Sequence, residues 1–358
     1  MIMTGTDTGN NRERKITLAA TIYDIAKHAG VSKSTVSRVL NNQANISKES
    51  RQKVLEAIDE LNYQPSKLAR ALTSSGFDAI MVISNRSTTT TTGNPFFSEI
   101  IQSISTQAEL ENFDLILQTA KNSEDELKKC LSKIQEKMIK GIIMLSSPAD
   151  EDFFHQLDPY NIPIVVTGKV EGHYKNIYSV DTDNFGDSYA LTKHLIKQGH
   201  KKIACIHAPL DYHVSIDRLA GFRSCLFDHQ LDLRNDWIID SGYSIEDSYK
   251  AALRLMESTD KPTAVFATDD LKVLSIYKMA ADKNLQIPAD FSVIGYNDKV
   301  ASSFLSPPLT SIDIPINKLG KKATNLLFRL IHQDKNVPKT TIIKTEMIER
   351  ESIQKIND

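Results

Sequence analysis

The first strongly amphipathic part of the chain lies between residues 21 and 64. Thr21 and Asp24 have the spacing of a helix capping box, and Gly30 supplies a left-handed stop a few residues later. Between them the apolar residues recur three or four positions apart, as on one face of a helix: Ile22, Ile25, Ala26 and Ala29. The pattern therefore predicts a short helix buried on one side.

Two more amphipathic stretches follow, capped by Ser32 and Ser47. In the first, the inward positions are Val36, Val39 and Leu40, and the outward ones are Lys33, Ser34, Ser37 and Arg38. The second packs through Val54, Leu55, Ile58 and Leu61. Two short helices joined by a tight turn predict a helix-turn-helix, whose second helix enters the DNA major groove. An ordinary three-helix bundle with a polar face is the alternative.

A further short helical segment, SKLARAL, follows Pro65 and carries Leu68 and Leu72 four residues apart. Helix nucleation is costly, so a segment of this length is not stable alone. We expect it to form only against DNA and a second copy of itself.

A linker follows at residues 74–76. Beyond it, the hydrophobic pattern no longer predicts helices alone but strands that alternate with helices. Buried strands are predicted in the runs AIMVIS, DLILQTA, GIIMLSS and IPIVVTG, and then in KIACIHA, WIIDSG, TAVFATD and FSVIGYN. Helices are predicted between them, including residues 184–199, 215–230, 244–258 and 270–284. This rhythm predicts two doubly wound α/β lobes of parallel strands, with ligand sites at the carboxyl ends of the strands and a cleft between the lobes.

Composition separates the two parts of the chain further. The 358 residues are 41% hydrophobic and 25% charged, as in a soluble globular protein of two or three domains. Residues 1–75 hold 11 Lys and Arg against 7 Asp and Glu, a balance of +4, and the remainder holds 32 against 38, a balance of −6. A basic head on an acidic body favours a nucleic-acid module attached to a domain with another task.

Cysteine use and the N-terminus indicate the compartment. Cys130, Cys205 and Cys225 show neither paired nor CxxC spacing, so no disulfide framework or zinc site is expected. Residues 1–20 are polar, lack a secretory apolar region and are predicted to be a disordered, solubilising tail; the alternative is that their basic residues touch phosphate. We expect a cytoplasmic protein with no membrane segment.

The stretch TIYDIAKHAGVSKSTVSRVLNN, followed by YQPSKLARAL, resembles the headpiece and hinge helix of the LacI/GalR family of bacterial transcriptional regulators. The resemblance implies that Lys33, Ser34 and Arg38 read base edges and that Leu72 wedges into the minor groove. Arg38 can make a bidentate contact to guanine, and an apolar wedge kinks a base step. The whole set expected at DNA is Thr21, Ser32, Lys33, Ser34, Ser37, Arg38, Asn45, Ala69 and Leu72.

From Ala79 to Arg350 the chain resembles the sugar-binding-protein-like core of the same family, through NPFFSEI, DRLAGFRSCL, PTAVFATDD and FSVIGYND followed by SPPLTSIDIP. The resemblance implies three crossings between the lobes, near residues 181, 311 and 335. The expected division is a tail at 1–20, a helix-turn-helix domain at 21–64, a hinge helix and linker at 65–76, a first lobe at 77–181 and 312–334, and a second lobe at 182–311 and 335–358.

The effector is expected to contact residues near the ends of strands. Arg218 falls on the arginine of the family's RxxGF motif, and its planar fork suits a hydroxyl pair or a carboxylate. Each of these residues also has a structural alternative. Arg218 can be a buried link between a helix and a loop, Phe96 and Phe97 can pack in the core, and Ser146 can cap a helix. Relatives often carry Asp where Asn297 stands. The full set is Phe96, Phe97, Ser146, Tyr212, Arg218, Tyr243, Asp269 and Asn297.

These features predict a homodimeric regulator of operator DNA, most simply a repressor of a sugar-utilisation operon, with no cofactor and no metal. STTTTTGNPFF resembles maltose and maltooligosaccharide regulators, and a purine or another sugar is the alternative effector. A sugar-uptake binding protein shares the two-lobed fold but has no use for a helix-turn-helix. An enzyme is not indicated, because phosphate-binding, zinc-protease and serine-hydrolase motifs are absent from the sequence. The run DTDN at 181–184 is expected to be a capped strand–helix turn.

Overall fold

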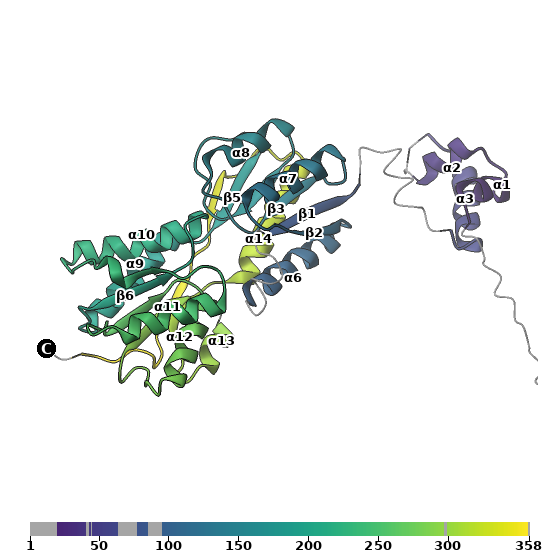
Figure 1. Cartoon of the computed structure of the whole chain (residues 1–358). Coiled ribbons are helices and arrows are strands. Elements are labelled where there is room, and N and C mark those ends of the chain that lie inside the picture. The colour runs from purple at the N-terminus through teal and green to yellow at the C-terminus, as the bar shows by residue number, and fades with distance from the viewer. Residues whose placement is uncertain are drawn as a thin grey trace, which may run out of the picture. The chain divides into compact units, whose positions relative to one another are not determined.

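The structure is a computed structural model that describes residues 20–40, 43, 45–63, 77–84, 95–296 and 299–356 (Figure 1). The chain divides into two compact units, Met1–Ser75 and Gly76–Asp358. The predicted hinge helix falls outside the described residues.

The N-terminal unit contains the three predicted helices, α1 (Ile22–His28), α2 (Lys33–Leu40) and α3 (Lys48–Glu60). The Asp24 carboxylate accepts hydrogen bonds from the Thr21 amide and hydroxyl, at 2.8 and 2.7 Å. Gly30 has the left-handed φ of +65° that ends the first helical segment. The hydroxyls of Ser32 and Ser47 accept hydrogen bonds from the backbone amides of Thr35 and Ser50, so the predicted helix starts are confirmed.

One small core holds these helices together: Ile25, Ala26, Ala29, Val36, Val39, Val54 and Ala57. One inward position predicted for α3 is wrong, because Leu55 is 48% exposed. Residues 54, 57, 58 and 61 follow the helical period more closely, so Ala57 takes the place expected for Leu55.

The second unit is built on two six-stranded sheets. The first has the order β11-β5-β4-β3-β1-β2, all parallel, from β1 (Ala79–Ser84), β2 (Asp114–Thr119), β3 (Gly141–Met144), β4 (Ile164–Thr167), β5 (Ile177–Asp181) and β11 (Thr340–Ile342). The second has the order β12-β10-β9-β8-β6-β7, from β6 (Ile203–His207), β7 (Ile238–Asp240), β8 (Ala264–Ala267), β9 (Ser292–Tyr296), β10 (Thr310–Asp313) and β12 (Glu346–Ile348). Only β12 is antiparallel to its neighbour among these paired strands.

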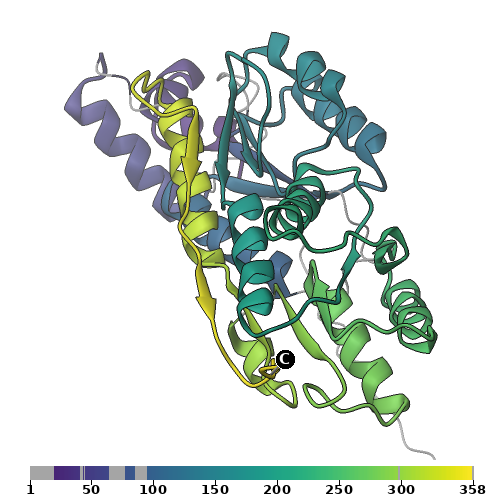
Figure 2. The same ribbon diagram turned by 90° about the vertical axis from the view of Figure 1, so that its left-hand side faces the viewer.

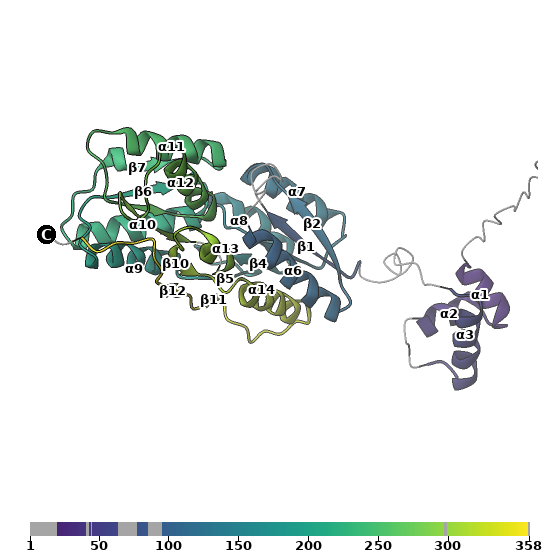
Figure 3. The same cartoon turned by 90° about the horizontal axis from the view of Figure 1, so that it is seen from below.

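Helices cover both faces of each sheet, as continuous apolar strands require. In the first lobe, α6 (Pro95–Leu110) and α14 (Ile316–Ile331) lie side by side on one face, and α7 (Ser123–Gln135) and α8 (Glu151–Leu157) cover the other (Figures 1 and 3). In the second lobe, α11 (Ile245–Glu257) and α12 (Asp270–Asp282) pack opposite α9 (Asn184–Lys197) and α10 (His213–Asp228). The short α13 (Lys299–Phe304) precedes β10. The predicted fold class is confirmed.

The chain passes between the lobes three times. It leaves the first sheet after β5, returns to α14 after β10, and crosses again between β11 and β12; Figure 2 shows this last segment running from one lobe to the other. The crossing expected near residue 335 is therefore misplaced. Residues 340–342 still belong to the first sheet, because Thr340 pairs with Ser179 and Ile342 with Asp181 along the open edge of β5.

Candidate functional site

Helix α2 carries the side chains expected to read DNA. Lys33, Ser34 and Arg38 are exposed and Ser37 is half-buried, whereas Val36 and Val39 on the opposite side are in the core. Thr21 and Asn45 are also exposed. Ala69 and Leu72 lie outside the described residues. The helix thus presents one polar, basic face, which is the arrangement that major-groove docking needs.

Two residues of this face also have structural tasks. The Lys33 ammonium lies 3.7 Å from the centre of the Tyr23 ring, and hydrogen bonding to Lys33 lowers the pKa of that tyrosine. The Ser32 hydroxyl caps α2 and lies 2.7 Å from that of Ser34. Tyr23 is 61% exposed and was not singled out in the sequence, although it orients a predicted DNA contact.

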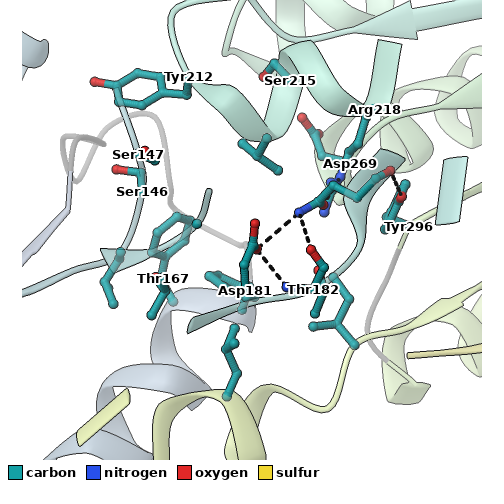
Figure 4. A pocket seen from close by; sticks show the side chains of 18 of the residues that line it. Ser146, Ser147, Thr167, Asp181, Thr182, Tyr212, Ser215, Arg218, Asp269 and Tyr296 are labelled. Atoms are coloured by element: carbon teal, nitrogen blue, oxygen red, sulfur yellow. Dashed lines mark hydrogen bonds between the residues drawn. The ribbon is translucent and has the colours of Figure 1, made fainter. Parts of the chain in front are cut away.

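A cavity of about 120 Å³ lies between the two lobes and is lined by residues from both. At roughly 30 Å³ per water molecule, this is room for about four waters. Among the residues that line it are Phe96, Phe97, Ser146, Tyr212, Arg218, Tyr243 and Asp269, which are seven of the eight predicted effector contacts. Asn297 lies outside the described residues. Figure 4 shows Ser146, Ser147 and Thr167 on one side of this cavity, and Arg218, Asp269 and Tyr296 on the other.

Arg218 is fixed by three neighbours of the second lobe. Its Nε donates to Asn184 Oδ1 at 2.9 Å, its Nη1 donates to the Thr268 carbonyl at 2.5 Å, and its guanidinium lies 3.6 Å from the centre of the Tyr296 ring. Tyr296 is fully buried and donates to the Asn184 carbonyl at 3.1 Å. Arg218 is therefore both the structural tie considered as an alternative and a cavity residue. Two of its five N–H donors are used in these bonds, so three have no partner among the residues that the structure describes and can serve a ligand.

Asp181 stands at the first crossing and brings a carboxyl group to the same cavity. Burial raises the pKa of this carboxyl to about 7, although the Thr182 amide and the Arg218 charge both favour its anion. The Thr182 amide and the Asn184 side-chain amide donate to Asp181 Oδ1 at 2.8 and 3.2 Å. Asp183 caps α9 by accepting the Gly186 amide at 2.9 Å, so the predicted capped turn is confirmed.

The first lobe supplies apolar walls and two serines. The rings of Phe96 and Phe97 lie 5.2 Å apart, edge to face, and both are partly exposed. The hydroxyls of Ser146 and Ser147 are buried and have no hydrogen-bond partner among the described residues. Helix capping, the alternative for Ser146, does not apply, because α8 is capped by Asp150. A buried hydroxyl without a partner loses its bonds to water, so a ligand that bonds to it recovers that loss.

Asp269 lines the cavity but is held by its own helix. Its Oδ1 accepts the amides of Leu271 and Lys272 at 3.0 and 3.2 Å, and its Oδ2 lies 3.0 Å from Lys272 Nζ. Lys272 is 1% exposed and also donates to the Gly242 carbonyl at 3.0 Å, next to Tyr243. Tyr243 donates in turn to Asp211 at 3.2 Å.

Several residues that line the cavity were not predicted from the sequence. Asp181, Thr182, Asn184 and Tyr296 were absent from the expected effector contacts, although DTDN gave a signal at the first crossing. The residues that the structure describes contain no cluster of His, Cys, Asp and Glu able to hold a metal ion. Within the same ranges, no helix is long and apolar enough to cross a membrane.

A helix-turn-helix unit joined to a two-lobed core, with a mainly apolar cavity that polar side chains enter from both lobes, defines a ligand-responsive, DNA-binding regulator. Comparison with known proteins agrees: residues 21–66 match the model for bacterial regulatory proteins of the lacI family, and residues 192–353 match the periplasmic binding protein-like domain. A relative described as the HTH-type transcriptional repressor PurR of Mannheimia succiniciproducens is 35% identical over 346 residues, covering 94% of this chain and 99% of the relative. The chain belongs to the lacI family of bacterial regulatory proteins, and it is a regulator rather than an enzyme.

Two solved structures are similar over most of their length. One is the complex of the transcriptional regulator CelR with cellobiose, at 26% identity and a TM-score of 0.70, covering 93% of this chain and 99% of that one. The other is a probable maltose operon transcriptional repressor, malR, of Staphylococcus aureus, at 25% identity and a TM-score of 0.68, covering 77% of this chain and 97% of that one.

Proposed function

We propose that this protein is a homodimeric, cytoplasmic repressor whose occupancy of operator DNA is controlled by a small molecule in the cavity between its lobes. The observation that carries the proposal is the cavity itself, which is lined by side chains of both lobes. Each headpiece reads half of a near-palindromic operator through Lys33, Ser34 and Arg38. The hinge segment at 65–76 pairs at the centre, with Leu72 as the wedge.

Ligand control requires that the two arrangements of the lobes bind the ligand with different affinity. Arg218 and Asp269 belong to the second lobe, and Ser146 and Phe96 to the first. A ligand that contacts all four residues favours one angle between the lobes. That angle sets the separation of the two hinges in a dimer, which couples the cavity to the operator.

The effector that we propose is a neutral sugar of the maltose type. Aromatic rings pack on the apolar face of a pyranose, while Arg218, Asp181 and the serine hydroxyls can donate to and accept from its hydroxyl groups. The likeness to a cellobiose-bound regulator and to a probable maltose operon repressor supports a sugar. A purine is the second candidate, supported by the relatives described as PurR, and it would stack flat between the same rings.

Calorimetry with maltose, maltotriose, glucose, galactosides and purines separates these candidates. We expect a sugar to bind one site per chain and to change operator affinity. Binding of a purine without any sugar would replace the proposed effector and leave the regulator class intact.

Arg38→Ala tests the DNA-reading face. We expect it to lose discrimination at one base pair of each half-site, about 1–3 kcal/mol, because a bidentate contact to guanine disappears. Binding to the operator, to single-base variants and to random DNA is measured by fluorescence anisotropy. Lys53→Ala, which removes the same charge from an exposed side chain paired with Glu49, is the matched control. Equal losses of Arg38→Ala on operator and random DNA would assign Arg38 to phosphate.

A further inference from the structure

A backbone clasp joins the lobes beside the cavity. Pro148 of the first lobe and Tyr212 of the second form an antiparallel bridge. The Ala149 amide donates to the Asp211 carbonyl at 2.8 Å, and the His213 amide donates to the Ser147 carbonyl at 3.0 Å. The two segments follow β3 and β6, an inner strand of each sheet.

The two backbone amides that donate in the clasp are not used in hydrogen bonds within helices or strands. His213 is the first residue of α10, where the amides of the first turn have no partner within the helix. Ala149 directly precedes Asp150, the cap of α8. Since both bonds are made by main-chain atoms, the clasp depends on the lobes meeting at one register and not on any side chain.

Two hollows lie on either side of the clasp. Ser147 and Tyr212 line the effector cavity, whereas Ala149 and His213 line an outer hollow of about 440 Å³. That hollow also has the chemistry of a sugar subsite, with two aromatic rings beside several carboxylates and imidazoles: Phe154, Tyr174, Asp150, Glu171, Asp217, His155 and His213. Lys169 from the first lobe lies 3.4 Å from Asp217 of the second and 2.6 Å from Glu171 at its edge.

We propose that this clasp sets the length of ligand that the cleft accepts. With the clasp made, the effector cavity and the outer hollow have no lining residue in common, so a ligand in the cavity is separated from the hollow by the clasp. A ligand with a second ring must break the two hydrogen bonds and extend into the outer hollow, where the Tyr174 ring gives it a stacking surface. The inference rests on the proposed sugar effector and deepens it by assigning the second subsite.

His213→Pro removes one bond of the clasp together with the imidazole that lines the outer hollow. Proline is well accepted at the first position of a helix, and Tyr212, with φ −134° and ψ 142°, has the extended conformation favoured before proline. His213→Ala is the matched control, because it loses the same imidazole and keeps the amide donor. Ala149→Pro, which removes the other bond, is the second variant.

Affinities for glucose, maltose and maltotriose are measured by calorimetry on the full chain. For His213→Pro we expect glucose to bind about fivefold more weakly and the longer sugars to bind as well as before or better, since they no longer have to break that bond. His213→Ala keeps the clasp bond and should bind glucose as the wild type does. Tyr174→Ala should weaken the two longer sugars alone. An unchanged ratio in both proline variants would overturn the inference.

Spin labels placed at exposed positions of the two lobes, Lys128→Cys and Lys250→Cys, report closure without any ligand. The three native cysteines are buried, so labelling is directed to the new ones. The proline variants should show a longer distance between the labels, and an identical distance would overturn the clasp. If none of the three sugars binds the wild-type protein, the proposed effector is wrong, and the label distance alone then decides whether the clasp holds the lobes.

Discussion

Two pairs of cavity residues, one from each lobe, differ in whether their polar atoms are already hydrogen-bonded. From the second lobe, Arg218 and Asp269 arrive already bonded to their neighbours, through Asn184, Thr268 and Lys272. From the first lobe, Ser146 and Ser147 bring buried hydroxyls without a partner among the described residues. Arg218 and Asp269 are therefore preorganised, whereas Ser146 and Ser147 have hydrogen-bonding capacity that a ligand can fill.

This difference separates two kinds of contribution to ligand control. A residue that is tied within its lobe supports both the fold and the ligand, so its loss should lower stability and affinity together. A hydroxyl that is bonded only when the ligand is present should affect affinity alone. Stability and binding, measured on the same variants, distinguish the two pairs.

The largest effect is expected for Arg218→Ala. Removing charge-assisted hydrogen bonds should lower effector affinity about 100-fold, and the loss of the ties to Asn184 and Thr268 should lower the melting temperature by several degrees. Operator binding without effector should stay at the wild-type level, because α2 is not altered. Arg223→Ala, an exposed arginine of the same helix, is the control for charge. Wild-type affinity in Arg218→Ala would move the effector site elsewhere.

Much of the fold was accessible from the sequence because periodicity reports burial directly. Strand β1 was predicted with its observed ends, and the Ser32 and Ser47 caps fixed two helix starts. The third crossing was misplaced because β11 has only three residues, two of them exposed, so nothing in its pattern distinguishes it from a loop. Its place depends on main-chain pairing with β5, which the side chains do not encode.

The cavity was accessible in part, for a related reason. Residues directly after strands, such as Ser146 and Asp269, were expected there because the carboxyl edges of parallel strands meet. Asn184 and Tyr296 reach the cavity through their bonds and contacts with Arg218, a relation between segments far apart in the chain. Lys272 looks like an ordinary polar helix residue in the sequence. Only the packed structure shows it buried against Asp269.

A smaller effect is expected from pH, through Asp181 at the boundary between the lobes. Burial raises the pKa of its carboxyl to about 7 in the folded chain, whereas the pKa of a carboxyl in the unfolded chain is about 4. Between these values the folded state binds the extra proton, so stability should fall as the pH rises from about 4 to about 7. The anion is the better acceptor for ligand hydroxyls, so affinity should rise over pH 6–8, by at most about tenfold per unit below the pKa.

Asp181→Asn should flatten both pH profiles, measured by thermal unfolding and by calorimetry. Asp183→Asn is the control, because that neighbouring carboxylate is exposed and caps α9. If the wild-type and Asp181→Asn profiles have the same slope, another group carries the pH dependence.

The smallest effect, and the sharpest test of the comparison, is expected for Ser147→Ala. Its buried hydroxyl is unpartnered in the described structure, so removing it should leave stability unchanged or raise it by about 1 kcal/mol. The backbone carbonyl of residue 147 is kept, and with it the bond to the His213 amide. Affinity for the strongest binder among the sugars and purines should fall about fivefold, because one hydrogen bond to the ligand is lost.

Ser188→Ala is the matched control from the second lobe. That hydroxyl is equally buried but lies 3.0 Å from the Tyr296 hydroxyl, so its loss should lower the free energy of unfolding by about 1 kcal/mol. If both substitutions destabilise the fold equally, the Ser147 hydroxyl is already satisfied without ligand, and the two pairs of cavity residues do not differ in the way that their hydrogen bonds indicate.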